Sequence, residues 1–132
     1  MNKINFDFKG RTAIVTGGAQ GFGLDIAKRF LISGAKVIIW DVDPLMLEKA
    51  TEGFNNPNLS TKNVDVSNYD QVESSVKEIV EKTKIDILIN NAGITGPTST
   101  LWEYDIDMWK KVVEINLMGT FNCCRAIVPN MI

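Results

Sequence analysis

The sequence contains no histidine and only two cysteines, which are adjacent at Cys123 and Cys124. The missing histidine excludes Ser-His and Cys-His nucleophilic catalysis and zinc sites of the usual Cys/His type within this sequence. Neighbouring helical residues point about 100° apart, so we expect no disulfide between the two cysteines. We interpret them as reduced, buried thiols of a cytoplasmic protein. A reactive cysteine is the alternative, but no histidine is present to activate it.

Long hydrophobic runs and an excess of charge are also missing. No apolar run approaches the ~20 residues of a membrane span, and the first ten residues, MNKINFDFKG, lack the apolar core of a signal peptide. The net charge of −2 gives no broad basic field for nucleic acid or an anionic membrane. With 132 residues, 45% of them hydrophobic, the composition is typical of one globular domain over residues 1–132.

Strand and helix patterns alternate along the chain. The predicted strands are 12–16, 36–40, 59–64 and 85–90. The predicted helices cover 21–33, begin at Asp43-Pro44 and at the capping-box pattern Ser67-x-x-Asp70, and run from about Asp107 to the end. This alternation predicts right-handed βαβ units in an α/β, Rossmann-like, doubly wound parallel sheet of order 3-2-1-4. Ligands of such sheets bind outside the carboxyl ends of the strands.

A glycine-rich turn joins the first predicted strand to the first helix. The stretch TAIVTGGAQGFGLDIAKRF, residues 12–30, includes Gly17, Gly21 and Gly23. A helix N-terminus presents free N–H groups and partial positive charge, and a pyrophosphate binds there if no Cβ blocks its approach. A tight turn with close helix–strand packing is the alternative reason for these glycines.

Asp41 ends the second predicted strand. A carboxylate at this point can accept both ribose hydroxyls of an adenosine and would repel a 2′-phosphate. Neither Gln20 nor Val42 supplies a positive charge for that phosphate. The pattern therefore favours NAD over NADP, while a capping or loop carboxylate remains the alternative interpretation of Asp41.

Polar residues also follow the third and fourth strands and interrupt the last helix. Asp65-Val66 is placed to contact an adenine or to lead into a helix. Asn90-Asn91-Ala92-Gly93 would allow backbone to lie against a ribose or nicotinamide, although asparagines at a strand end are also ordinary turn residues, which is the better interpretation of this motif alone. Asn116 lies between apolar residues of the last helix, where its amide could bond the neighbouring backbone or hold a water.

The ordered set of motifs resembles the short-chain dehydrogenase/reductase family. The matching residues are Thr16-Gly17-Gly18-Ala19-Gln20-Gly21-Phe22-Gly23, Asp41, Asp65-Val66, Asn90-Asn91-Ala92-Gly93 and Asn116-Leu117-x-Gly119. Each motif is weak or moderate alone, whereas their order over residues 8–132 is highly specific. The resemblance covers the cofactor-binding half of the family pattern.

The resemblance implies an NAD-dependent oxidoreductase acting on a small alcohol or carbonyl substrate, in a homo-oligomer without nucleic acid, membrane or metal. The implied cofactor-binding residues are Gly17, Gln20, Gly21, Phe22, Gly23, Asp41, Asp65, Val66, Asn91, Ala92 and Gly93. Asn116 matches the catalytic asparagine that anchors a proton-relay water. Sugars and 3-oxoacyl thioesters are the substrates that the loop GITGPTSTLWEY suggests.

The family's catalytic serine and Tyr-x-x-x-Lys have no match here. Tyr69 is followed four residues later by Glu73, and Tyr104 by Met108. We therefore expect this chain to be the cofactor-binding half of an enzyme, truncated and inactive alone. A naturally short regulatory binding module is the alternative; a methyltransferase is disfavoured by the motif order, and a P-loop enzyme by the lack of Gly-Lys-Ser/Thr.

The predicted fourth strand and last helix would leave apolar surface uncovered. The strand IDILIN would form a sheet edge, and such edges invite association. The last helix carries apolar residues on several sides. We predict that the isolated chain is poorly stable or self-associates; a cooperative melt of a monomer at low concentration would contradict this.

Overall fold

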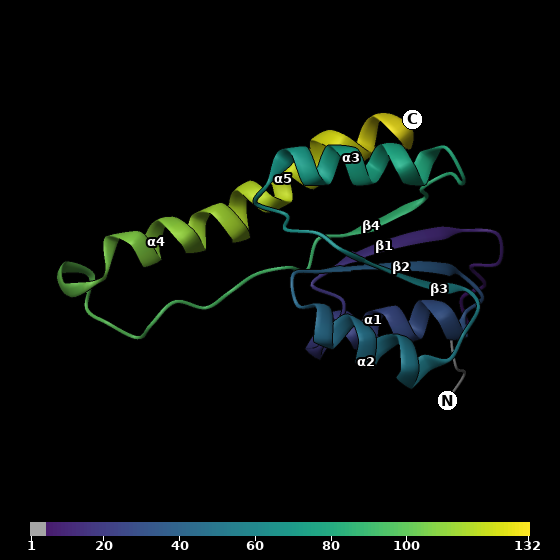
Figure 1. Cartoon of the computed structure of the whole chain (residues 1–132), viewed down its shortest axis with the longest axis horizontal. Helices are drawn as coiled ribbons and strands as arrows, with labels where there is room; N and C mark the ends of the chain where they lie inside the picture. The colour runs from purple at the N-terminus through teal and green to yellow at the C-terminus, as the bar shows by residue number, and fades with distance from the viewer. Residues whose placement is uncertain (1–4) are drawn as a thin grey trace.

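The computed structural model describes residues 5–132, so the first four residues of the segment compared above with a signal peptide lie outside the described residues. Four parallel strands form one sheet in the order β3-β2-β1-β4 (Figure 1), as the sequence predicts. The strands are β1 (Thr12–Thr16), β2 (Lys36–Asp41), β3 (Leu59–Asn63) and β4 (Ile87–Ile89). Within residues 5–132, no helix is long and apolar enough to cross a membrane.

Helices cover both faces of the sheet. In Figure 1, α1 (Gly21–Ile32) and α2 (Pro44–Phe54) lie on one face, and α3 (Tyr69–Val80) and α5 (Gly119–Ile127) lie on the other. Each face has its own apolar core: one packs Val15, Ala27 and Ile39 together, and the other packs Ile14, Val72 and Ile127. The two cores follow from β1, whose five residues are all buried and point alternately to the two faces.

Two helix starts test the predicted caps. Asp43 caps α2 as expected, because its Oδ1 accepts hydrogen bonds from the N–H groups of Leu45 and Met46 at 3.0 and 3.2 Å. The predicted capping box at Ser67 is wrong. Asn68 is the cap of α3, with its Oδ1 accepting from Gln71 N, whereas the Ser67 hydroxyl donates to Asp65 instead. The carboxylate two residues earlier thus competes successfully for the serine.

The predicted long last helix is interrupted. The helix α4 (Ile106–Val113) continues into a π-helical segment, Glu114–Met118, before α5 begins at Gly119, and a short 3₁₀ turn follows at Val128–Asn130. Another 3₁₀ turn, Leu101–Glu103, precedes α4. Figure 1 shows α4 extending away from the sheet. Several large apolar side chains of this region are exposed, as the sequence suggested: Leu101, Trp102, Ile106, Trp109, Leu117 and Phe121.

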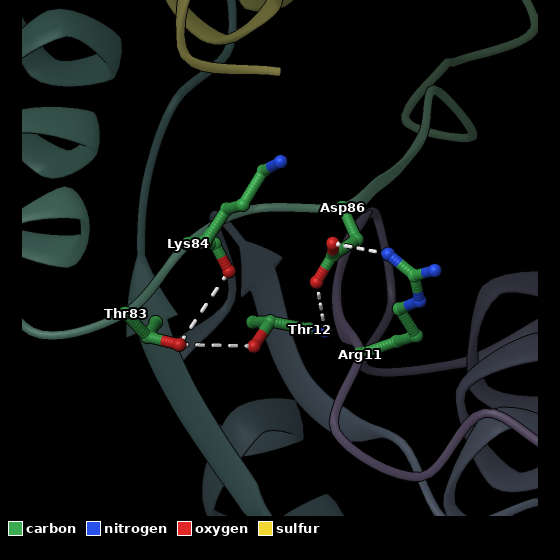
Figure 2. Close-up of polar contacts among 5 residues, drawn as sticks. All are labelled: Arg11, Thr12, Thr83, Lys84 and Asp86. Carbon is green, nitrogen blue, oxygen red and sulfur yellow. Dashed lines mark hydrogen bonds and ion pairs between the residues drawn. The ribbon is translucent and has the colours of Figure 1, made fainter. Parts of the chain in front are cut away.

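The strand β4 is shorter than the predicted 85–90, and side chains add to the main-chain bonds beyond its ends, although Asp86 N still donates to Thr12 O at 3.0 Å. At its amino end, Asp86 accepts hydrogen bonds from Thr12 N and from Arg11 Nη1, both at 2.9 Å (Figure 2). Thr83 and Thr12 join their hydroxyls there at 3.1 Å. The N–H group of Thr12 is the main reason that the pKa of Asp86 lies below its ordinary value, with the Arg11 guanidinium adding to the effect and desolvation opposing it.

Candidate functional site

A cleft of about 340 Å³ lies at the carboxyl ends of the strands. Its lining comes from the turns after all four strands and from the segment joining α4 to α5. The lining residues are Gly17, Gln20, Phe22, Asp41, Val42, Val64, Asp65, Val66, Asn91, Ala92, Gly93, Ile94 and Ile115. The fold therefore brings together most of the sequence-predicted site; Gly21, Gly23 and Asn116 are the predicted residues that do not line this cleft.

The glycines of the first turn serve two different purposes. A Cβ on Gly23 would overlap the carbonyl oxygen of Gly17, and a Cβ on Gly17 would lie 2.8 Å from Ala92 Cα, so close internal packing requires both. Gly21 instead has a φ of +55° and no atom within 4 Å of a Cβ position, which leaves its backbone open. A tight turn and close packing thus account for all three glycines, and the backbone of Gly21 also leaves open space for an approaching ligand.

The first turn of α1 begins at Gly21. Its cap residue, Gln20, makes no side-chain hydrogen bond to the helix N-terminus, and the first turn contains no acidic residue. Leu24 N still donates to the main-chain oxygen of Gln20 at 3.2 Å. The N-terminal N–H groups and the helix dipole therefore keep a partial positive charge, which neither the Gln20 side chain nor an acidic residue of the first turn offsets.

Thr16 and Asn91 tie the glycine turn to the segment after β4. The Thr16 hydroxyl oxygen accepts from the N–H groups of Asn91 and Ala92, both at 3.0 Å, and donates to Ile89 O at 3.3 Å. The Asn91 amide donates in turn to the main-chain oxygens of Thr16 and Gly17, both at 3.0 Å. Both amide hydrogens of Asn91 are thus used inside the protein, so this side chain fixes the walls of the cleft.

Asp41 is a buried carboxylate at the middle of the cleft. It is 8% exposed, its Oδ2 accepts from Ala19 N at 3.2 Å, and its Oδ1 accepts from Asp43 N at 3.1 Å. Each carboxylate oxygen can accept a further hydrogen bond. No lysine or arginine is among the described residues that line the cleft. An incoming hydroxyl pair would therefore meet free acceptors, whereas an incoming phosphate would meet an unscreened negative charge.

One end of the cleft is apolar and is closed by Val64 and Val66, which are 1% and 5% exposed. Between them, Asp65 Oδ1 accepts from both Ser67 N at 2.9 Å and the Ser67 hydroxyl at 2.6 Å. Asp65 N donates to the side chain of Gln71 at 3.0 Å. Asp65 therefore shapes the turn that places the two valines, in addition to lining the cleft itself.

Asn116 lies in the π-helical segment and pairs with main chain across from it. Its Oδ1 accepts from Ile94 N at 2.8 Å, and its Nδ2 donates to Ile94 O at 2.9 Å. Of the two roles that the sequence left open, bonding to the neighbouring backbone is therefore the one observed. The π segment, a feature that frequently marks functional sites, holds the turn after β4 through this pair.

The remaining candidates lie away from the cleft. Tyr69 contacts Arg125, whose guanidinium carbon is 5.0 Å from the ring centroid, and Tyr104 packs edge-on against Trp109. Burial raises the pKa of the Cys123 thiol to about 12, so this cysteine stays neutral near pH 7. Both cysteines are free, as predicted, but the expectation that both are buried is wrong for Cys124, which is half-buried because neighbouring helical residues point in different directions. A larger hollow of about 930 Å³, beside residues 5–8 and α1, contains no part of the glycine turn.

Two residues that shape the cleft, Thr16 and Asn122, are not among the site residues predicted from the sequence. Thr16 was part of the glycine motif, but its hydroxyl bonds depend on residues more than 70 positions later. Asn122 is 6% exposed, and its Nδ2 donates to Val66 O at 2.9 Å. A buried asparagine beside two cysteines in an apolar stretch was the signal that could have identified it, since buried amides need partners.

Comparison with known proteins gives a consistent result. The family model described as short chain dehydrogenase matches residues 11–132. A 2-dehydro-3-deoxy-L-rhamnonate dehydrogenase (NAD(+)) of Sphingomonas sp. (strain SKA58) is 38% identical over 95% of this chain and 50% of its own length. A 3-oxoacyl-[acyl-carrier-protein] reductase of Chlamydia pneumoniae is 37% identical over 93% of this chain and 50% of its own length.

A solved structure extends this similarity to three dimensions. A short-chain dehydrogenase/reductase of Brucella melitensis, described as glucose/ribitol dehydrogenase, has a TM-score of 0.89 and 31% identity over 96% of this chain and 55% of its own. The chain thus spans about half the length of the relatives that it matches. The family match over residues 11–132, supported by these relatives, shows that the chain belongs to the short-chain dehydrogenase family of oxidoreductases.

Proposed function

We propose that this chain is the NAD(H)-binding half of an oxidoreductase that interconverts a secondary alcohol and a ketone. The observation that carries the proposal is Asp41, a buried carboxylate in a cleft whose described lining has no lysine or arginine. Such a site accepts ribose hydroxyls and disfavours a 2′-phosphate. The name of the Sphingomonas relative, which includes NAD(+), supports the same cofactor.

The start of α1 and the other lining residues fit the remaining parts of a dinucleotide. The open backbone at Gly21 and the uncapped start of α1 suit a pyrophosphate. Val64 and Val66 suit the flat face of an adenine. The opposite end, formed by Ala92, Gly93 and Ile94, leaves room for the second ribose and the nicotinamide, with Gln20 and Phe22 at the turn between the two ends.

The bound nicotinamide would supply the hydride acceptor or donor, and the residues of this chain would bind and orient it. Asn116 would hold the turn beside it through Ile94. The family's catalytic serine and Tyr-x-x-x-Lys have no counterpart in this sequence. We therefore expect this chain alone to bind the cofactor without catalysing turnover. The printed activities of two relatives support a sugar-type or 3-oxoacyl substrate for the complete enzyme, which we place in the cytoplasm as a homo-oligomer.

The test compares Asp41→Ala with a matched variant, Asp43→Ala. Both substitutions remove a carboxylate that accepts backbone N–H groups, but only Asp41 lines the cleft. We expect calorimetric titration to show NAD⁺ binding to the unaltered chain and at least about a tenfold weaker affinity in Asp41→Ala, since hydrogen bonds to a charged group are worth about 1.5–3 kcal/mol. Asp43→Ala should lower stability by about 1 kcal/mol and keep the affinity.

Three results would contradict the proposal. The first is failure of the unaltered chain to bind NAD⁺, and the second is tighter binding of NADP⁺ than of NAD⁺. The third is an unchanged affinity for NAD⁺ in Asp41→Ala. Binding of S-adenosylmethionine in place of NADH would assign the cleft to another class of ligand.

A further inference from the structure

Two residues of α5 support the apolar end of the cleft from behind. Gly119 and Asn122 are both buried, with Asn122 6% exposed, and neither lines the cleft. Val66 contacts both of them and lines the cleft. A change at these two positions can therefore reach a bound ligand through Val66.

The contact at Gly119 leaves no room for a side chain. A Cβ at this position would lie 2.6 Å from Val66 Cγ2 and 3.2 Å from Val66 Cβ. Valine is stiff about χ1, so Val66 cannot simply rotate away. An alanine at 119 would instead push Val66 away from α5. Because the cleft is the open space beside Val66, this displacement would narrow the cleft.

The contact at Asn122 fixes the main chain of the same turn. Its Nδ2 donates to Val66 O at 2.9 Å and to Ser67 O at 3.3 Å. The turn is held from its other side by Asp65, through the two bonds from Ser67. Val66 is thus fixed by a steric contact at its side chain and by a hydrogen bond at its carbonyl group.

The opposite wall depends on the same helical stretch. Asn116, three residues before Gly119, pairs with both main-chain polar groups of Ile94, which lines the other end of the cleft. The π-helical segment and α5 together therefore contact both turns: the turn after β3 through Gly119 and Asn122, and the turn after β4 through Asn116. The three residues therefore contact both turns, which the sheet separates by the strands β2 and β1.

We propose that Gly119 and Asn122 are positioning residues that set the width of the cleft at its apolar end, and thereby its fit to the base of an adenine nucleotide. This inference rests on the proposed nucleotide-binding function and gives two residues outside the cleft a part in that function. The base fits against Val66 only while α5 holds this valine back. The probe is ADP, which carries the base, one ribose and the pyrophosphate, and NAD⁺ is the second ligand.

The experiment measures ADP and NAD⁺ affinity by calorimetry for Gly119→Ala, on the folded fraction determined by circular dichroism. We expect both affinities to fall by the same factor, roughly three- to tenfold, because overpacking at the base end affects each ligand equally. Val66→Ala removes the overlapping methyl group together with part of the contact to the base, so it serves as a background in which Gly119→Ala should cost little further affinity. It also provides a folded variant if Gly119→Ala alone unfolds the chain. Asn122→Leu, without the donating amide, should weaken both ligands in the same sense.

Two controls separate positioning from stability. Gly53→Ala adds the same Cβ to a helical glycine with nothing within 4 Å and should change neither affinity. Asp43→Ala lowers stability without touching the cleft and should also keep both affinities. Unchanged ADP affinity in folded Gly119→Ala and Asn122→Leu would overturn the inference while leaving the proposed function intact. An equally large loss from Gly119→Ala in the Val66→Ala background would do the same. Failure of the unaltered chain to bind either ligand would overturn both.

Discussion

The two ends of the β1–β4 pair are held together by different chemistry. At the amino end, a carboxylate, Asp86, accepts from Thr12 N and from the Arg11 guanidinium (Figure 2). At the carboxyl end, neutral groups do the same work: the Thr16 hydroxyl and the Asn91 amide. A threonine of β1 takes part at each end, Thr12 at the amino end and Thr16 at the carboxyl end. The two ends therefore share a residue type, but only the amino end uses charged partners.

This difference has a functional reason under the proposed function. The carboxyl end borders the cleft, where a fixed ion pair would compete with the partial charges of the helix N-terminus and with Asp41. Neutral hydrogen bonds hold the two turns together without adding net charge to the site. The amino end lies away from the cleft, so an ion pair there adds no charge to the lining of the cleft. The short strand β4, of three residues, needs both attachments because it pairs with only one neighbour, β1.

The largest effect is expected from Thr16→Val, at the neutral end. Valine keeps the shape but removes the acceptor of two N–H groups, and leaving buried donors unbonded costs about 1–3 kcal/mol each. We expect the free energy of unfolding in urea to fall by roughly 2–4 kcal/mol. Thr51→Val is the matched control, since Thr51 is exposed, donates to Leu47 O of its own helix, and has only the Thr61 hydroxyl, at 3.5 Å, as a further partner among the described residues. A loss equal to that of the control would mean that the hydroxyl does not hold the two turns.

A smaller effect is expected from Asp86→Asn, at the charged end. The amide can still accept from Thr12 N but loses the charge that Arg11 faces. We expect about 1–2 kcal/mol lower stability at pH 7. The comparison between the two ends would fail if Asp86→Asn were the more damaging of the two substitutions.

The same substitution predicts a pH dependence. The pKa of Asp86 in the folded protein lies below its ordinary value of 3.8, so the carboxylate adds stability above the unfolded pKa and loses that contribution as pH falls through the folded pKa. The stability difference between the unaltered chain and Asp86→Asn should therefore be constant near neutral pH and shrink below about pH 4. Urea unfolding at a series of pH values measures it. A difference that grew in acid would have the wrong sign for this carboxylate.

The smallest effect is expected from Arg11→Ala. The Arg11 side chain is 61% exposed, so its ion pair with Asp86 is screened by solvent and should contribute less than about 1 kcal/mol. High salt should remove most of this difference, because exposed charges are screened beyond a few ångströms at about 1 M salt. A salt-independent loss would point to packing of the arginine stem in place of its charge.

Much of this architecture was predictable from local patterns. Apolar runs and helical spacing identified the strands and helices, and Asp43-Pro44 identified the start of α2, because each signal acts over a few neighbouring residues. The sheet order β3-β2-β1-β4 followed from the handedness of βαβ connections, which is a property of every such chain. The cleft position and most of its lining residues followed from the strand ends.

The sequence by itself therefore determined the order of elements, the location of the cleft and the glycine, Asp41 and Asn116 motifs. The tertiary structure alone decided which way the polar groups turn: Asn91 inward to the glycine turn, Ser67 to Asp65, and Asn122 to Val66. It also decided that the last helix is interrupted at Asn116. Most of these contacts join residues that are far apart in the chain, so a buried polar group finds its partner only after packing has fixed which backbone groups lie within its reach.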